Sequence, residues 1–140
     1  MNTPIEETLV LIKPDGVARN LTGEILRRIE AKGYSLVDIK LVQADRDVLA
    51  AHYAEHEGKP FYQPLVEFME SGPLVALRIA GNRAIEGFRA LAGTTDPTTA
   101  APGTIRGDLG RDWGVKVQQN LVHGSDSPES AARELTLWFK

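Results

Sequence analysis

The stretch ETLVLIK, residues 7–13, is a short run of apolar side chains that ends in a lysine. Such a run is typical of a buried strand. The residues PDGV follow it, and Pro14 and Gly16 predict that the chain turns directly after the strand. Lys13 is therefore expected at an edge of a sheet, which is where open sheets usually bind ligands.

Helix and strand patterns alternate along the rest of the chain. Thr22 and Asp45 are predicted helix N-caps, and Gly33 is a predicted C-terminal stop. Apolar spacing predicts helices over 21–32, 45–56, 61–70, 82–92 and 128–139, and further strands over 34–43, 74–80 and 115–122. Four strands with helices between them predict an α/β (α+β) sandwich, in which a four-stranded antiparallel sheet of the ferredoxin-like type is covered by helices.

Length and composition restrict the classes of protein. A chain of 140 residues without an internal linker predicts a single domain over 1–140. The chain has no cysteine, which favours a reducing, cytoplasmic location, and it has no apolar run that approaches the ~20 residues needed to span a bilayer. A net charge of −3 argues against nucleic acid as the main partner.

The segment from Gly93 to about Gly114 is predicted as one long loop. It exceeds the ~12 to 15 residues that usually limit structureless connections, and such loops are commonly functional. Within it, PGTIRGD places turn-forming residues on both sides of Arg106. A solvated surface loop is the alternative interpretation.

Cationic residues and one histidine fall at predicted element ends. Lys13 ends a strand, Arg89 lies near the end of a helix, and Arg106 lies in the long loop. His123 lies between the strand predicted over 115–122 and the turn GSDS. Because imidazole has an ordinary pKa near ~6.5, it is mostly neutral at pH 7 and keeps a nucleophilic lone pair. A histidine nucleophile among cations suits an anionic substrate.

The segment HYAEH, His52 to His56, offers a different enzyme. It matches the H-x-x-E-H pattern, in which two histidines one helical turn apart bind zinc and a glutamate activates water. No third zinc ligand follows from the sequence. We therefore favour a solvated helix face for this segment and keep a zinc hydrolase as an alternative.

Taken in order, several motifs resemble those of nucleoside diphosphate kinase along essentially the whole chain. They are LVLIKPDGV, HYAEHEGKPF, SGPLVA, RALAGTTDP, PGTIRGD and NLVHGSDSPESAARE. The resemblance implies that His123 takes the γ-phosphate of a nucleoside triphosphate, such as ATP, and passes it to a nucleoside diphosphate by a ping-pong mechanism. It also implies that Glu134 orients the imidazole, and that Mg²⁺ is carried mainly by the nucleotide phosphates.

The same resemblance assigns the remaining site residues. Phe61 is similar to the residue that stacks on the base, Val117 to the apolar residue on the other side of the base, and Leu65 is expected to line that slot. The residues expected at the phosphates or sugar, or in support of the histidine, are Lys13, Tyr53, Arg89, Thr95, Arg106, Asn120 and Ser125. With an apolar slot, we expect broad tolerance of base and sugar.

Two features depart from the family pattern. The segment LGRDWGVKVQQ, residues 109–119, is several residues longer than in typical members, so Val117 is assigned by counting back from Asn120. The chain ends at Lys140 after LWF, as in short bacterial members. Family members form hexamers or tetramers, so a homo-oligomer is expected. A catalytically silent nucleotide-binding module is the second alternative, although it would be expected to lose His123 or a cation, and these are present.

Overall fold

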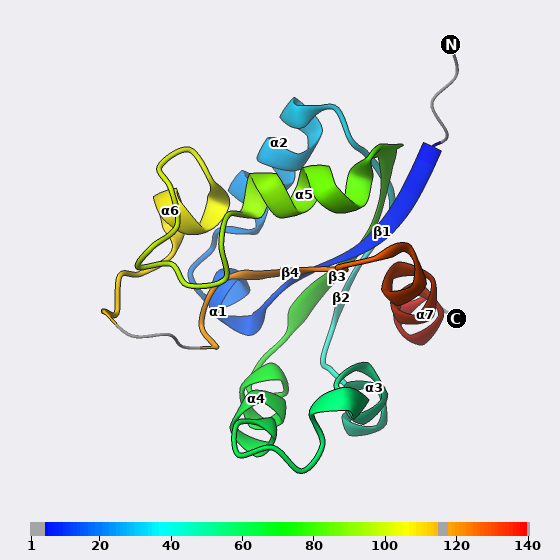
Figure 1. Cartoon of the computed structure of the whole chain (residues 1–140), viewed down its shortest axis with the longest axis vertical. Coiled ribbons are helices and arrows are strands. Elements are labelled where there is room, and N and C mark those ends of the chain that lie inside the picture. The colour runs from blue at the N-terminus through cyan, green and yellow to red at the C-terminus, as the bar shows by residue number, and fades with distance from the viewer. Residues whose placement is uncertain (1–4, 115–117, 140) are drawn as a thin grey trace.

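The computed structural model describes residues 5–114 and 118–139. Its strands form one sheet in the order β2-β3-β1-β4, and each neighbouring pair is antiparallel. The strands are β1 (Ile5–Ile12), β2 (Ser35–Val42), β3 (Leu74–Asn82) and β4 (Val122–Gly124). The four-stranded antiparallel sheet with helices, expected from the sequence, is confirmed (Figure 1).

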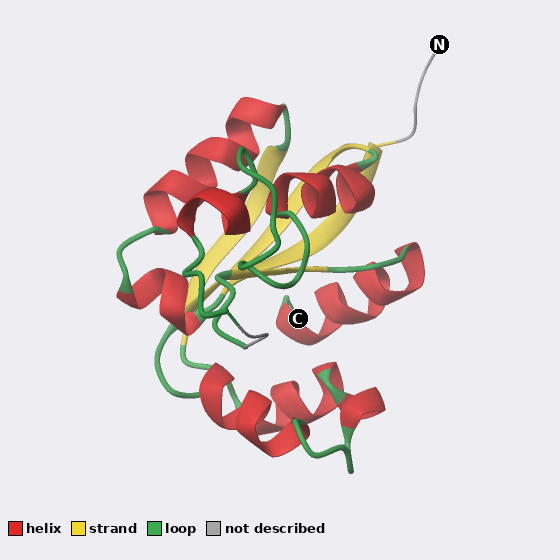
Figure 2. Ribbon diagram, turned by 60° about the vertical axis from the view of Figure 1, so that its left-hand side comes forward, coloured by secondary structure: helices red, strands yellow, loops and turns green. Residues whose placement is uncertain are grey.

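Helices cover both faces of this sheet (Figure 2). The buried residues of α2 and α5 pack on one face, and those of α3, α4 and α7 pack on the other. The helices are α1 (Pro14–Ala18), α2 (Thr22–Lys32), α3 (Arg46–His52), α4 (Tyr62–Met69), α5 (Ala84–Ala92), α6 (Ile105–Leu109) and α7 (Pro128–Trp138), with a 3₁₀ turn at Ala54–His56.

The two-sided cover explains the unbroken apolar run of β1. Val10 and Ile12 belong to the core under α2 and α5, whereas Leu9 and Leu11 belong to the core under α3, α4 and α7. Successive side chains of a strand point to opposite faces, so a strand covered on both sides favours apolar residues at consecutive positions. The buried strand predicted from ETLVLIK is confirmed, and it pairs with β3 on one side and β4 on the other.

The predicted helix signals have mixed outcomes. The Asp45 carboxylate accepts a hydrogen bond from the Asp47 amide at 2.6 Å, and Gly33 ends α2 in the left-handed region at φ 108°. Thr22, however, is the first residue of its helix and makes no capping hydrogen bond. The prediction for Thr22 was wrong because Leu21 occupies the cap position.

Several predicted boundaries are also corrected. The helix expected over 45–56 ends at His52, and the 3₁₀ turn follows it. The long connection from Gly93 contains a short helix, α6, which carries Arg106. The strand expected over 115–122 is not observed at residues 118–121, while residues 115–117 lie outside the described residues. Strand β4 begins only at Val122, so His123 lies within a strand.

Within residues 5–114 and 118–139, no helix has the length and apolar character required to cross a membrane.

Candidate active site

A cavity of about 280 Å³ lies where the end of β1, the start of β4 and the segment before α6 meet. Strand pairing creates this junction, because Leu11 of β1 lies opposite His123 of β4. Lys13 follows β1 directly, so the antiparallel register brings it close to the residues that precede β4. The wall of the cavity includes the following residues named from the sequence: Lys13, Tyr53, Arg89, Thr95, Arg106, Asn120, His123 and Glu134.

His123 is held by a carboxylate from α7. Its Nε2 lies 2.8 Å from Oε1 of Glu134, and the hydroxyl of Ser125 donates to the same oxygen at 2.7 Å. A carboxylate only accepts, so Nε2 carries the proton and Nδ1 keeps its lone pair. None of the described residues hydrogen-bonds to Nδ1. This arrangement leaves one nitrogen of His123 free to act as a nucleophile.

Glu134 remains ionised despite its burial. Burial acts to raise the pKa of Glu134, but the hydrogen bond and charge of His123, followed by His52 and Ser125, outweigh it and lower the pKa to about 2. An ionised carboxylate at neutral pH is the form that can accept both hydrogen bonds. The orientation of His123 therefore persists through the physiological pH range.

Lys13 is a buried ammonium group. Its Nζ donates to Oδ1 of Asn120 at 2.7 Å, and its side chain faces the cavity. Burial, and then the charge of Arg106, lower the pKa of Lys13 to about 7, and Asp15 opposes this effect. An anionic ligand in the cavity would favour the charged form of Lys13.

Arg106 links α6 to β4. Its guanidinium group donates to the carbonyls of Asn120, Gly93 and Val122 at 3.0, 2.9 and 2.6 Å. Arginine has five N–H donors, so two remain for an anion in the cavity. Burial, and then the charge of Arg89, lower the pKa of Arg106 to about 10, so the group stays protonated at neutral pH.

Arg89 and Asn120 complete the polar wall. Arg89 of α5 donates to the carbonyl of Gly124 at 3.4 Å, directly after His123. Asn120 donates from its amide to the carbonyl of Thr95 at 2.9 Å while its oxygen accepts from Lys13. Asn120 therefore joins β1 to the segment that follows α5.

Tyr53 and His52 approach from α3 and the residue after it. The ring of His52 lies edge to face against both Tyr53 and His123, with ring centroids 4.6 and 4.7 Å apart. Burial, with the charge of Glu134, raises the pKa of Tyr53, so its hydroxyl stays protonated. It is a neutral hydrogen-bond donor beside the nucleophile.

The interpretation of HYAEH as a solvated helix face was wrong for His52. Only 4% of His52 is exposed, and its Nδ1 accepts a hydrogen bond from Nε1 of Trp138 at 3.0 Å. Burial, followed by the charge of His123, lowers the pKa of His52 to about 3. His56 lies in the 3₁₀ turn, not one turn further along the same α-helix, so the zinc spacing is not formed.

Three of the predicted residues that the structure describes are not part of the cavity wall. Ser125 lies behind Glu134 and acts through it. Phe61 is 43% exposed and touches His56, which does line the cavity. Leu65 is buried in the core beneath α4. Val117 lies outside the described residues.

The sequence interpretation missed His52 and its partner Trp138. One signal was present, because His52 follows Leu49 by three positions and therefore lies on the buried face of the same helix. Trp138 is buried in the last helix, and the N–H of a buried tryptophan requires a partner. His52 supplies that partner.

Within the described residues, His52, His123 and Glu134 bring potential metal-ligand atoms within 4.8 Å of one another. Their hydrogen bonds already account for this closeness, because Glu134 accepts from His123 and Ser125, and His52 accepts from Trp138. Two imidazoles and one carboxylate are also not the oxygen-only set that Mg²⁺ prefers. The group is better described as a hydrogen-bonded cluster than as a metal site.

Comparisons with known proteins identify the family of this chain. The family model for nucleoside diphosphate kinase matches residues 6–140. Nucleoside diphosphate kinases of Mycolicibacterium gilvum (strain PYR-GCK) and Streptomyces avermitilis are 62% and 60% identical to this chain over 135 residues, which cover 96% of this chain and 96% of each relative.

A solved structure is also similar. A halophilic nucleoside diphosphate kinase from Halobacterium salinarum, in complex with CDP, superimposes with a TM-score of 0.92 at 45% identity, covering 98% of this chain and 89% of that one. A nucleoside diphosphate kinase family protein from Babesia bovis gives 0.90 at 47% identity, covering 96% and 88%. This chain belongs to the nucleoside diphosphate kinase family.

Proposed function

We propose that this chain transfers the γ-phosphate of a nucleoside triphosphate to a nucleoside diphosphate through a phosphohistidine on His123. The hydrogen bond between His123 and Glu134 carries the proposal, because it leaves Nδ1 free in a cavity whose wall is cationic. Membership of the nucleoside diphosphate kinase family supports this activity. The relative from Halobacterium salinarum is described in complex with CDP, which supports a nucleoside diphosphate as ligand.

In the first half-reaction, the lone pair of His123 Nδ1 attacks the γ-phosphorus. The bond from that phosphorus to the bridging oxygen breaks, and its electron pair leaves with the nucleoside diphosphate. The proton on Nε2 stays in its hydrogen bond with Glu134. A terminal oxygen of a second diphosphate then attacks the phosphorus of the phosphohistidine, and the bond from phosphorus to Nδ1 breaks and returns its electron pair to the ring. The kinetics are ping-pong because one site serves both nucleotides in turn.

Cations around His123 stabilise the group in transfer. Phosphoryl transfer spreads negative charge over the equatorial oxygens, so catalysis depends mainly on positioning and on electrostatic stabilisation. The groups available in the cavity are the Lys13 ammonium, the guanidinium groups of Arg89 and Arg106, and the Tyr53 hydroxyl. Thr95 and Asn120 supply neutral polar contacts beside them.

The carboxylates on the cavity wall are the side chains that could bind Mg²⁺ directly. The carboxylates on the wall are Glu55, Asp126 and Glu134, and Glu134 is engaged by His123 and Ser125. These residues fit a Mg²⁺ that is carried by the nucleotide phosphates and water, because Mg²⁺ usually keeps several waters and binds substrate phosphates. When bound, the ion would neutralise charge on the phosphates.

The base is proposed to stack on Phe61. This ring is exposed at the rim of the cavity, next to His56. Stacking tolerates any base, and an apolar contact without polar readers discriminates by only ~1 to 3 kcal/mol. We therefore propose broad use of purine and pyrimidine nucleotides, ribo and deoxy alike.

The central experiment is labelling with γ-labelled ATP and Mg²⁺ in the absence of an acceptor. The protein should become labelled through an acid-labile, base-stable phosphoramidate, and His123→Ala should abolish the label. His56→Ala is the matched control for which histidine carries the label: His56 lines the cavity next to Phe61, so the rate of labelling is expected to change, but the covalent label should still form. Label that persists in His123→Ala would contradict the assignment of His123 as the phosphorylated residue.

An acceptor series at fixed ATP and Mg²⁺ tests specificity. Diphosphates of the common bases should differ in kcat/KM by up to roughly a hundredfold, and Phe61→Ala should weaken all of them together. A preference of about ten-thousandfold for one base would instead require a polar group against the base edge.

The cellular setting follows from composition and surface. We propose a cytoplasmic homo-oligomer, a hexamer or tetramer, with no nucleic acid as main partner and no membrane association. The edge strand β2 supports self-association, because Ile39 and Leu41, two residues apart on one face, are 48% and 66% exposed, and Val37, at the irregularity of the strand, is 50% exposed. Edge strands with apolar side chains are ready sites for pairing.

The alternatives have weaker support. A silent nucleotide-binding module has no need for a free Nδ1 between a fixed carboxylate and several cations. A zinc hydrolase requires both histidines of HYAEH on one helix, and that geometry is not formed.

A further inference from the structure

Asp15 lies beside the active site without being part of the cavity wall. It belongs to the first turn of α1, two residues after Lys13. Its Oδ2 accepts a hydrogen bond from the backbone amide of Leu121 at 3.2 Å. Its Oδ1 is buried and has no hydrogen-bond partner among the described residues.

Leu121 has an unusual backbone conformation. Its φ is 76°, in the left-handed region that non-glycine residues rarely occupy, and its side chain is fully buried. The carbonyl of Leu121 accepts from the amide of Lys13 at 2.8 Å, so both polar backbone groups of this residue are held by the segment from Lys13 to Asp15. A strained residue of this kind persists only where its surroundings hold it.

Leu121 lies between Asn120 and the strand that carries His123, and both of these residues belong to the proposed site. Asn120 binds Nζ of Lys13, and Val122 begins the strand that carries His123. The left-handed turn at Leu121 therefore determines the directions in which the side chains of Asn120 and His123 leave the backbone. Asp15 contacts this turn from α1, a sequence separation of 106 residues.

Asp15 also contributes negative charge at a cationic wall. In the described part of the chain, the groups that interact electrostatically with Lys13 are Arg106 from α6, His52 from α3 and Asp15 from α1. Lys13 also shares the cavity wall with His123 and with Glu134, whose carboxylate is held by His123 and Ser125. The charge of Asp15 raises the pKa of both Lys13 and Arg106. Burial raises the pKa of Asp15 itself, while the Lys13 charge and the Leu121 amide act in the opposite direction.

We propose that Asp15 is a positioning residue for phosphotransfer, because its carboxylate holds the Leu121 turn that directs Asn120 and His123 and places a negative charge beside the Lys13 ammonium group. The proposal rests on the function proposed above. It separates into a geometric part and an electrostatic part, and two substitutions at the same position distinguish them.

Asp15→Asn tests the electrostatic part. Asparagine keeps the shape and an oxygen that can accept from the Leu121 amide, but it has no charge. The measurement is the pH dependence of kcat/KM for phosphoenzyme formation from ATP, which reports groups of the free enzyme. The basic limb, where Lys13 loses its proton, should move to lower pH by about one unit or more, while the rate near pH 6 stays within about threefold of the unsubstituted enzyme.

Asp15→Ala tests the geometric part. Without an acceptor for the Leu121 amide, the rate near pH 6 should fall roughly tenfold or more, and the basic limb should shift as in Asp15→Asn. Glu30→Gln, which removes an exposed carboxylate from α2, is the control and should match the unsubstituted enzyme at every pH. Thermal unfolding of each variant confirms that it is folded.

The outcomes are separable. A pH profile of Asp15→Asn that superimposes on the unsubstituted profile would overturn the electrostatic part. A folded Asp15→Ala variant with full activity near pH 6 would overturn the geometric part. If the unsubstituted enzyme itself forms no phosphohistidine, the proposed function fails first, which the labelling experiment detects independently.

Discussion

At the scale of a single residue, one carboxylate oxygen of Glu134 fixes the orientation of the His123 ring. Its Oε1 accepts from both His123 and Ser125, and the carboxylate is almost completely buried. Because its pKa in the folded protein is lowered to about 2, this interaction is fully present above the ordinary carboxyl pKa near 4.5 and is lost only as the pH falls through about 2. From the wall of the cavity, Glu134 fixes the tautomer of His123, the proposed nucleophile.

Glu134→Gln should therefore lower kcat much more than it changes KM. The amide can donate to Nε2, which would favour the tautomer with the proton on Nδ1 and remove the attacking lone pair. We expect kcat to fall about a hundredfold or more, with nucleotide KM within about threefold, in steady-state kinetics. Glu129→Gln, an exposed glutamate in the first turn of the same helix, should have no effect. Unchanged kcat with a raised KM would place Glu134 at the substrate instead.

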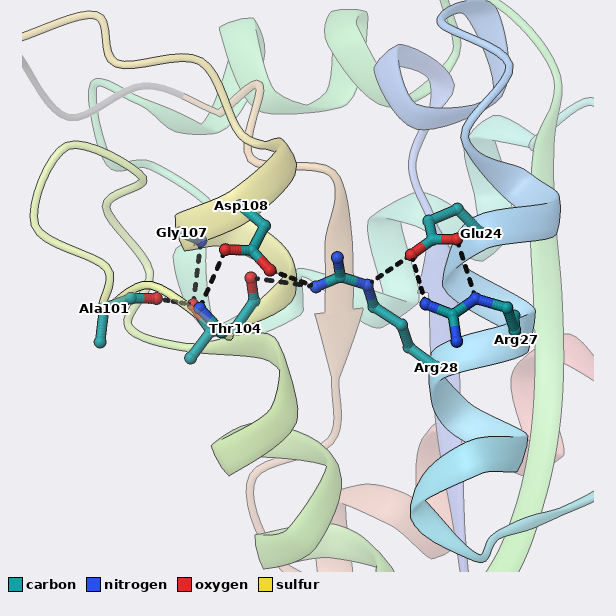
Figure 3. Close-up of polar contacts among 8 residues, drawn as sticks. Glu24, Arg27, Arg28, Ala101, Thr104, Gly107 and Asp108 are labelled. Carbon is teal, nitrogen blue, oxygen red and sulfur yellow. Dashed lines mark hydrogen bonds and ion pairs between the residues drawn. The ribbon is translucent and has the colours of Figure 1, made fainter.

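At the scale of elements, α6 shows how a short helix is held in place. The hydroxyl of Thr104 accepts from the Gly107 amide at 2.9 Å and donates to the Ala101 carbonyl at 2.6 Å. Arg28 of α2 bridges Glu24 to Asp108 on α6, with both contacts at 2.8 Å (Figure 3). A five-residue helix has little stability of its own, so these contacts from outside it position Arg106.

Thr104→Val should loosen this helix. The loss of the N-cap should lower the free energy of unfolding by about 1 kcal/mol, measured by urea denaturation, and turnover should fall because Arg106 lies in the first turn of α6. Thr22→Val is a matched control, since Thr22 begins α2 without a capping hydrogen bond. Equal losses in both variants would show that the Thr104 hydroxyl does not act as a cap.

At the scale of the whole molecule, the exposed face of β2 is the feature that a single chain leaves unexplained. Ile39 and Leu41 are about half and two-thirds exposed and border a shallow groove with Val17 of α1. Isolated exposed apolar side chains are ordinary, but a row of them on an edge strand is a typical site of association.

Leu41→Glu should dissociate the proposed homo-oligomer, because it places charge in an apolar contact between copies. Light scattering should then report the mass of one chain in place of a multiple of it. Lys40→Gln, on the other face of β2, is the control and should leave the mass unchanged. A single-chain mass for the unsubstituted protein would remove the proposal of an oligomer.

The local part of this fold follows directly from the sequence. The apolar run of β1, the cap at Asp45 and the stop at Gly33 are confirmed, because each depends on neighbours within a few residues. The antiparallel sheet with helices was also predicted, since alternating patterns leave few ways to bury every apolar face. The positions of Lys13 and Arg89 at element ends follow from the same local signals.

Tertiary structure decided the details that make a site. The strand predicted over 115–122 includes Leu121, yet Asp15 and Lys13 bind the backbone of Leu121 and hold it in a left-handed turn, so β4 begins later than expected. A hydrogen bond from Trp138, 86 positions away in sequence, accompanies the burial of His52, although the segment HYAEH resembles a solvated helix face. Periodicity reports which face of an element is buried. The partner of a buried polar group is determined by residues far away in sequence, so only the folded chain reveals it.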